Sequence, residues 1–195
     1  KKYILTTSHC TSAIHLALVA LGIKKGDEVI VPDLTWVASA APITYLGAIP
    51  VFADVDPKTL CLSAETIKKK ITKKTKLIVV VDLLGNLPEW DNIKKLCKRK
   101  NIKILEDAAE SIGSKYKGRK AGSFGDVSVF SFNATKLINS GQGGCFCTND
   151  YKLYKIAKLY SHHGMNKENP TKFFWSTVIG FQYNWTNIQA AMALS

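Results

Sequence analysis

The sequence predicts an α/β fold, in which a mostly parallel (mixed) sheet is sandwiched by helices. Short apolar runs rich in β-branched residues alternate with segments whose apolar residues recur at helical spacing. No internal repeat or low-complexity linker interrupts this alternation over 195 residues, a length that suits one sizeable domain. The composition, with 46% hydrophobic and 22% charged residues, is ordinary for a globular chain and excludes a disordered or coiled-coil protein.

Strands are expected where short apolar runs are bounded by turn-forming residues. These runs are 3–7, 28–32, 51–54, 77–82, 102–106, 127–132 and 145–148. Helices are expected at 11–21, 36–46, 64–71, 88–100 and 150–160, and again from Thr186. Pro88 at a helix start and Gly22 and Gly47 at helix ends support these boundaries. Ligands of such sheets bind beyond the carboxyl ends of the strands, so site residues are expected there.

The charge balance is strongly basic. Lys and Arg number 27 against 15 Asp and Glu, which gives a formal net charge of +12. This surplus is compatible with polyanions, anionic membranes or phosphorylated small molecules, and it selects none of them. Six lysines lie within 68–76, where a solvated helix end and loop is the favoured interpretation. A nucleic-acid patch is the alternative, but no aromatic residues interleave with the lysines, so no nucleic-acid partner is expected.

The cysteines are scattered, odd in number and without a CxxC pair; they are Cys10, Cys61, Cys97, Cys145 and Cys147. We expect reduced thiols in a cytoplasmic protein and no metal site, because zinc would need four converging ligands. Cys145 and Cys147 would share one strand face, which indicates packing. No membrane contact is expected, because prolines and a glycine break the longest uncharged stretch, 34–53.

Three segments at expected strand ends or helix starts carry side chains suited to chemistry. Ser8–Ser12 opens the first helix, where free N–H groups and hydroxyls can bind an anion, although a plain helix cap is commoner. Asp107 ends a buried strand, so its carboxylate either caps the next segment or holds a cationic ring nitrogen. Trp36 opens the second helix and either packs in the core, which is the default, or forms a flat stacking wall.

Lys136 is the candidate nucleophile. It follows the apolar strand at 127–132 in the segment SFNATK, and a loop with Gly141, Gly143 and Gly144 comes next. A lysine is normally a solvated charge, but beside a buried strand and hydroxyls its amine can be freed for Schiff-base chemistry. The glycines do not match the GxGxxG fingerprint and do not follow the first strand, so an NAD site is rejected.

Together these parts match the needs of one cofactor, pyridoxal 5′-phosphate (PLP). A helix start suits its phosphate, an aromatic wall suits its ring, an acid suits its ring nitrogen and a lysine suits its aldehyde. Each part alone is weak evidence, whereas the whole set in one α/β chain is more specific.

The sequence also resembles the DegT/DnrJ group of nucleotide-sugar aminotransferases, which are fold-type I PLP enzymes. The resemblance runs over essentially the whole chain and is carried by LGIKKGDEVIVPDLTWVASAAPITYLGAIPVFADVDPKT, ILEDAAESIGSKYKGRKAGSFGDVSVFSFNATK, GQGGCFCTND and TNIQAA. Relatives are about twice as long, and this chain starts on an expected strand and stops within an expected helix. The resemblance therefore implies a PLP-binding large domain over 1–195 that lacks the C-terminal small domain.

The resemblance implies roles for four residues around the cofactor ring. Lys136 matches the lysine that forms the Schiff base with the cofactor and shuttles protons. Asp107 matches the acid that pairs with the pyridine nitrogen, and Trp36 matches the aromatic residue that stacks on the ring. Glu110 stands where relatives place Gln, Glu or His near the ring hydroxyl.

The resemblance also implies contacts to the cofactor phosphate, with three departures from the family pattern. Thr11 and Ser131 match phosphate contacts. Cys10 stands in the phosphate loop where many relatives have a small residue, often Gly. Gln182 replaces the Asn that reaches the phosphate of the neighbouring subunit, and Asn184 replaces an Arg. We expect Gln182 to keep its contact with a shift, because Gln retains the amide.

The implied activity is transfer of an amino group, from glutamate, to a nucleotide-linked keto-sugar in a homodimer with shared active sites. The segment EDAAES resembles that of enzymes acting at C4 of 4-keto-6-deoxy sugars. Two alternatives stay open: a truncated or degenerate member that binds PLP without turnover, and a basic nucleic-acid-binding regulatory protein. Neither the nucleotide nor the aminated carbon follows from the sequence.

Overall fold

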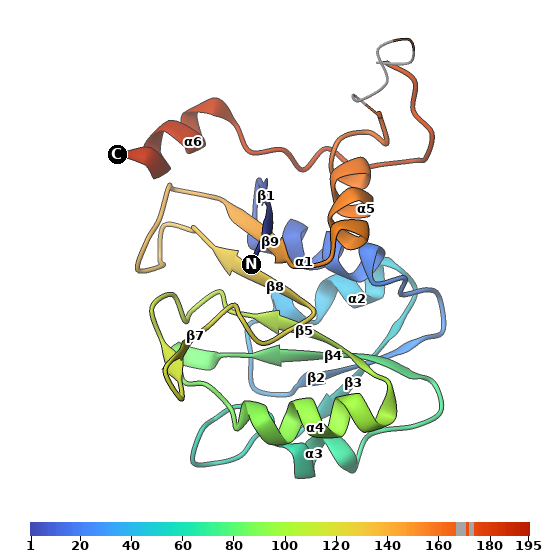
Figure 1. The fold of residues 1–195 in the computed structure, drawn as a ribbon, viewed down its shortest axis with the longest axis vertical. Helices are drawn as coiled ribbons and strands as arrows, with labels where there is room; N and C mark the ends of the chain where they lie inside the picture. The colour runs from blue at the N-terminus through green and yellow to red at the C-terminus, as the bar shows by residue number, and fades with distance from the viewer. Residues whose placement is uncertain (167–170, 172–173) are drawn as a thin grey trace.

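The computed structural model describes residues 1–166, 171 and 174–195. These residues form a seven-stranded sheet in the order β1-β9-β8-β5-β4-β2-β3 (Figure 1). The strands are β1 (Tyr3–Thr7), β2 (Glu28–Pro32), β3 (Ile49–Ala53), β4 (Thr75–Val81), β5 (Lys103–Asp107), β8 (Val127–Ser131) and β9 (Gly144–Thr148). Within this sheet β9 runs antiparallel to both of its neighbours, and the other pairs are parallel. The predicted mixed, mostly parallel sheet is therefore confirmed.

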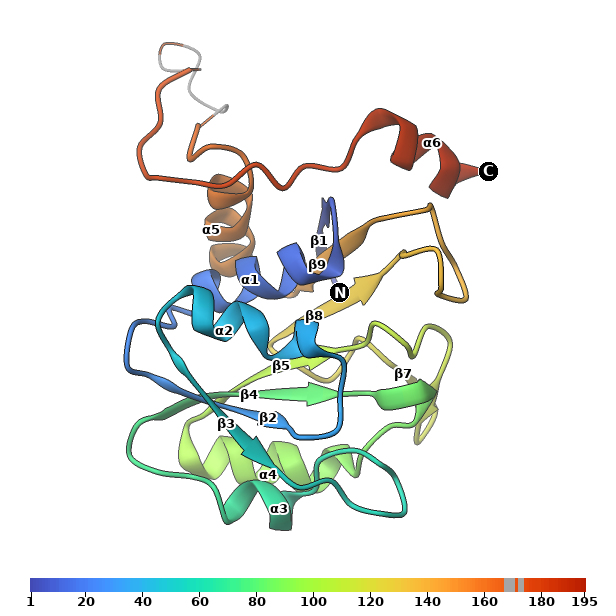
Figure 2. The same cartoon turned by 180° about the vertical axis from the view of Figure 1, so that it is seen from behind.

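Helices cover both faces of the sheet (Figures 1 and 2). One face carries α1 (Cys10–Ala20), α2 (Ala41–Tyr45) and α5 (Tyr151–Ser161), and the other carries α3 (Ala64–Lys68) and α4 (Trp90–Lys100). The last helix, α6 (Asn187–Leu194), lies beyond the β1–β9 edge and buries none of its side chains. Among the described residues, none of the helices has both the length and the apolar character to cross a bilayer.

Each face of the sheet has its own apolar core. Beneath α1, side chains such as Leu16, Val79 and Phe146 are fully buried. Beneath α4, the buried Trp90 stacks on Phe124 with ring centroids 5.0 Å apart. Burial of a large apolar side chain stabilises a fold by roughly 1.5–3 kcal/mol. Because these cores fix β4, β5 and β8 side by side, the residues at their carboxyl ends also have fixed positions.

The two acidic residues that end β5 point to opposite faces of the sheet, because side chains alternate along a strand. Asp107 points to the face covered by α1, and Glu106 points to the face covered by α4. The fully buried carboxylate of Glu106 accepts four hydrogen bonds, from the N–H groups of Gly122 (2.5 Å), Phe124 (2.8 Å) and Gly125 (2.9 Å) and from the Ser128 hydroxyl (2.8 Å). Glu106 thereby fixes the loop between β5 and β8.

The single helix predicted at 36–46 is wrong in detail. A 3₁₀ turn at Val37–Ser39 precedes α2, and Ala40 between them has a φ of −104°. Pro42 occupies the first turn of α2, where its missing N–H is tolerated but a continuous helix from Trp36 is not. The break leaves Ser39 buried beside the strand ends.

A short hairpin of β6 (Lys115–Tyr116) and β7 (Arg119–Lys120) was not predicted. Its turn places both Lys117 and Gly118 at positive φ, which suits a tight two-residue hairpin. Two-residue strands carry too little periodicity to be detected in a sequence.

Replacing Glu106 with Gln tests the importance of its carboxylate for the fold. We expect the free energy of unfolding to fall by about 2–4 kcal/mol. The Gln side chain has an NH2 group in place of one acceptor oxygen, so its two N–H donors would face other buried donors. Urea unfolding followed by circular dichroism measures the change. The exposed Glu65→Gln variant is the matched control and should change stability by less than about 0.5 kcal/mol. Equal effects of the two substitutions would contradict this role for Glu106.

Candidate functional site

A cavity of about 440 Å³ opens at the carboxyl ends of the central strands. The last residues of β4, β5 and β8, namely Val81, Asp107 and Ser131, all line it. Its walls include seven of the eight side chains singled out from the sequence: Cys10, Thr11, Trp36, Asp107, Glu110, Ser131 and Lys136. The predicted location of the site, beyond the strand ends, therefore agrees with the structure, while the role of each residue stays a prediction.

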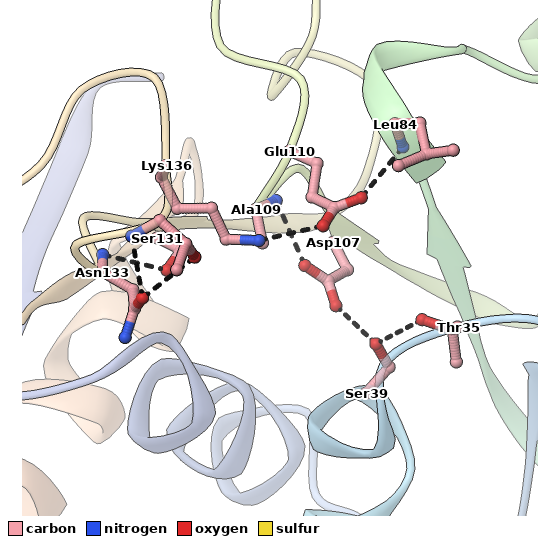
Figure 3. A network of polar contacts seen from close by, with 10 residues as sticks. Thr35, Ser39, Leu84, Asp107, Ala109, Glu110, Ser131, Asn133 and Lys136 are labelled. Carbon is pink, nitrogen blue, oxygen red and sulfur yellow. Dashed lines mark hydrogen bonds and ion pairs between the residues drawn. The ribbon is translucent and has the colours of Figure 1, made fainter.

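Asp107 is held rigidly at the base of the cavity. Its side chain is 3% exposed, and Oδ2 accepts a hydrogen bond from the Ser39 hydroxyl at 2.8 Å (Figure 3). Oδ1 accepts from the backbone N–H of Ala109 at 3.2 Å, so the capping interpretation holds in part. Burial raises the pKa of Asp107, and these hydrogen bonds oppose the rise only partly. A cation brought beside this carboxyl group would favour its ionised form.

Lys136 forms an ion pair with Glu110 at the mouth of the cavity (Figure 3). Lys136 Nζ lies 2.9 Å from Glu110 Oε1, and the two side chains are 23% and 28% exposed. Glu110 Oε2 also accepts a hydrogen bond from the backbone N–H of Leu84 at 2.9 Å. Burial alone would raise the pKa of Glu110, but the hydrogen bonds from Lys136 and Leu84 outweigh it and hold the pKa below its ordinary value. Lys136 is thus directed inward by a partner rather than solvated.

The start of α1 presents backbone donors to the cavity. His9 is the N-cap residue, and within the described chain no side chain caps this helix end. His9, Cys10 and Thr11 line the cavity, so the uncapped N–H groups of the first turn and the positive end of the helix dipole face it. A Cβ on Gly144 would lie 2.5 Å from the backbone nitrogen of Cys10, so only glycine permits this approach of β9 to α1.

The loop that carries Lys136 is braced from the C-terminal part of the chain. The indole of Trp185 stacks on Phe132 at 5.6 Å, and its Nε1–H donates to the carbonyl of Gln142 at 3.2 Å. Gly143, at φ +147°, packs so closely that a Cβ there would lie 2.6 Å from the indole nitrogen. The glycines of this loop therefore make tight contacts.

Trp36 is not a core residue, contrary to the default interpretation. Its side chain is 76% exposed and lines the cavity. The residue is extended, with φ −66° and ψ 139°, and lies just before the 3₁₀ turn. An exposed indole at the mouth of this cavity is free to stack on a flat ligand.

Cys10 and Gln182 represent the two departures at the expected phosphate contacts. The Cys10 thiol lies in the cavity wall, and burial raises its pKa, so it remains a neutral thiol there. Gln182 lies outside the cavity of this chain; Gln182 Oε1 and Asn184 Nδ2 are 3.0 and 2.7 Å from Nδ1 of His162. Its expected contact with a neighbouring subunit's phosphate stays a prediction.

The cysteines are all free thiols. Cys145 and Cys147 are both buried on β9, with their sulfur atoms 3.6 Å apart, so the predicted packing on one strand face is confirmed. Among the described residues, no group of three or more His, Cys, Asp or Glu side chains converges in a way that could hold a metal ion.

Two supporting contacts were not foreseen from the sequence. Ser39, which anchors Asp107, is itself within hydrogen-bond distance (2.9 Å) of the Thr35 hydroxyl. Ser111 donates to the buried carboxyl group of Asp82 at 3.0 Å. The bonds from Ser39 to Asp107 and from Ser111 to Asp82 join segments that are far apart in the sequence, and the only signal for Asp82 was its place at the end of an apolar strand.

The fold and the cavity define a class of α/β protein in which a lysine, a buried carboxyl group and an open helix start share one ligand site. The chain belongs to the DegT/DnrJ/EryC1/StrS aminotransferase family, whose model matches residues 1–195. This agrees with the resemblance seen in the sequence.

Three similar proteins illustrate the match. The GDP-perosamine synthase of Caulobacter vibrioides is 45% identical over 194 residues, covering 100% of this chain and 52% of the relative. The crystal structure of an aminotransferase from Psychrobacter cryohalolentis has a TM-score of 0.94 at 35% identity, covering 99% of this chain and 51% of that one. NtdA of Bacillus subtilis, solved with its bound cofactor PMP, has a TM-score of 0.91 at 32% identity, covering 100% and 43%. The chain therefore spans about half the length of these proteins.

The ion pair at the cavity mouth predicts a pH-dependent effect of Glu110→Gln. A carboxyl group whose pKa is lowered on folding stabilises the protein above its unfolded pKa, and this contribution is lost as pH falls through the folded pKa. We expect the variant to be less stable by about 0.5–1 kcal/mol at pH 7, a modest value because water partly screens the pair. The difference should vanish in acid, once the pH lies below the folded pKa of Glu110. Urea unfolding at pH 7 and in acid measures it, and a difference that persists in acid would contradict this account.

Proposed function

We propose that residues 1–195 form the large, cofactor-binding domain of a PLP-dependent aminotransferase. The observation that carries this proposal is the opening of Lys136 and Asp107 onto one cavity that the start of α1 also faces. Family membership and the bound PMP of NtdA, a structural relative, support it.

The side chains present fit PLP. The cavity volume lies within the range of ordinary small-molecule sites. The uncapped first turn of α1 offers N–H donors to a phosphate, and the neutral Cys10 thiol adds no negative charge there. The buried carboxyl group of Asp107 has no cationic hydrogen-bond partner among the described residues, which suits it to a protonated ring nitrogen.

When bound, PLP supplies an electron sink for bond cleavage at an amino-acid carbon. Asp107, fixed by Ser39, would hold the proton on the ring nitrogen. Trp36 would cover one face of the ring and exclude water from it. Lys136 is the only lysine in the cavity wall within the described chain, so its Nζ would take and return the proton at the substrate carbon. Glu110 holds that amine at the mouth.

We further propose that the substrate is a GDP-linked 4-keto-6-deoxy sugar and that glutamate is the amino donor. The similarity to GDP-perosamine synthase supports the nucleotide, and the EDAAES segment supports the class of sugar. The net charge of +12 suits a substrate that carries a diphosphate.

The proposal includes a homodimer in the cytoplasm. Large apolar side chains that are exposed on this chain include Ile179, Ile188 and Leu194, all in its C-terminal part. A second copy covering them would bury this surface, and it would bring Gln182 toward the neighbouring phosphate site.

Reduction of the PLP-loaded protein with borohydride, followed by peptide mass mapping, tests the cofactor site. We expect the label on Lys136, at a stoichiometry near one per chain. Lys136→Ala should abolish the label, whereas Lys103→Ala, at the end of β5 opposite to the cavity, should leave it intact. Labelling spread over surface lysines, or no label in the complete gene product, would contradict the proposal.

Amination assays with a panel of nucleotide-linked keto-sugars test the substrate. With glutamate as donor, we expect kcat/KM for the GDP-linked 4-keto-6-deoxy sugar to exceed those for the TDP- and UDP-linked analogues by about 100-fold or more, because a site that hydrogen-bonds guanine leaves polar groups unpaired with other bases. Equal rates with all three would refute the GDP assignment but not the aminotransferase activity.

A further inference from the structure

Two segments that are distant in the sequence are tied together behind the cavity. One is residues 82–84, directly after β4, and the other is residues 107–111, at and after the end of β5. The N–H of Asp82 donates to the carbonyl of Asp107 at 3.0 Å, and the Ser111 hydroxyl donates to Asp82 Oδ2 at 3.0 Å. The N–H of Leu84 donates to Glu110 Oε2 at 2.9 Å. These three bonds flank both carboxyl groups that face the cavity.

Asp82 is an unexpected residue at this position. It is fully buried, Oδ1 has no hydrogen-bond partner within the described structure, and Ser111 is 1% exposed. Burial, followed by the charge of Glu106, raises the pKa of Asp82 to about 8. Glu106 already has four donors of its own and offers none to Asp82. An apolar side chain would fill this place at lower cost, so the acid indicates a need for an acceptor opposite Ser111.

The turn after Asp82 is strained. Leu84 has a φ of 53°, a left-handed conformation that is strained for a residue other than glycine. Its side chain is 72% exposed, so apolar burial does not offset this strain. The hydrogen bond that this conformation does make goes to Glu110. Strained backbone of this kind is typical of functional sites.

From these contacts we infer that Asp82 and Ser111 are positioning residues, which fix the turn at 108–111 so that Glu110 holds Lys136 in the cavity. This inference rests on the proposed function of Lys136 for its catalytic meaning. The contacts themselves are independent of the cofactor. Ser111 lies next to Glu110 in the chain. The hydrogen bond from Ser111 to Asp82 therefore fixes the position of the Glu110 carboxylate, which faces the cavity.

Competitive acetylation of Lys136 in the cofactor-free gene product tests the inference. The rate at pH 7, relative to the exposed Lys69 in the same molecule, reports how firmly Lys136 is paired, because the paired ammonium form does not react. We expect Ser111→Ala to raise this relative rate about threefold, because the loss of one hydrogen bond loosens the carboxylate that holds Lys136. Ser111→Thr, which keeps the hydroxyl, and Asp82→Asn, which keeps an acceptor, should stay near the wild-type rate.

A double-mutant cycle separates positioning from general loosening. If Ser111 acts through Glu110, Ser111→Ala should leave the rate unchanged in a Glu110→Gln background. The matched control Ser161→Ala removes another buried hydroxyl, which donates to the carbonyl of Lys158 far from the cavity, and should change nothing. An equal increase in both backgrounds, or no increase with Ser111→Ala alone, would overturn the inference.

The assay also distinguishes this inference from the proposed function. Acetylation is measured without PLP, so it does not depend on cofactor uptake. A Ser111 effect on Lys136 in a protein that takes up no PLP would support the positioning pair while the aminotransferase proposal fails. PLP bound at Lys136 with no Ser111 effect would support the aminotransferase proposal and overturn the positioning pair.

Discussion

Side chains along β5 alternate between the two faces of the sheet, and the structure on each face depends on this alternation. Glu106 and Asp107 are neighbours in the chain, yet one points under α4 and the other under α1. Glu106 collects four donors and fixes the loop that leads to β8. Asp107 stands at the base of the cavity with Ser39. A shift of one residue in the register of β5 would turn Asp107 away from the cavity and take Glu106 away from its four donors.

Close backbone packing completes the site that β5 begins. Gly144 allows the start of β9 to touch the start of α1, which turns uncapped N–H groups toward the strand ends. Gly143 allows Trp185 to pack on the loop that carries Lys136. The cavity thus combines an uncapped helix start, a buried acid and a directed amine, each positioned by a different part of the chain. Because separate segments supply these groups, PLP matches the cavity better than a nucleotide cofactor, which would be held by one glycine-rich loop.

Much of this architecture could be predicted from the sequence, because the strands and their ends follow from the apolar pattern, whereas the order of the strands in the sheet does not. Asp107 and Lys136 were located by their positions just beyond buried strands. Glu110 and Gln182 came only from the family resemblance, since nothing in the local pattern distinguishes them from surface residues. The sequence pattern left Trp36 between core packing, the default for an indole in an apolar segment, and a stacking wall; its place on the cofactor ring came from the family resemblance. The break in the helix after Trp36 was not predicted. The sequence could not predict the roles of Ser39, Asp82 and Ser111, because their hydrogen bonds join segments that are 29 to 68 residues apart.

The measurement that tests the central claim most directly is a crystal structure of the complete gene product with PLP. The account predicts cofactor density joined to Lys136, with the ring nitrogen about 2.7–3.0 Å from Asp107 and the phosphate at the start of α1. It also predicts that Trp36 covers the ring and that Ser39 keeps its bond to Asp107. A cofactor bound elsewhere, or a ring nitrogen facing away from Asp107, would contradict the account.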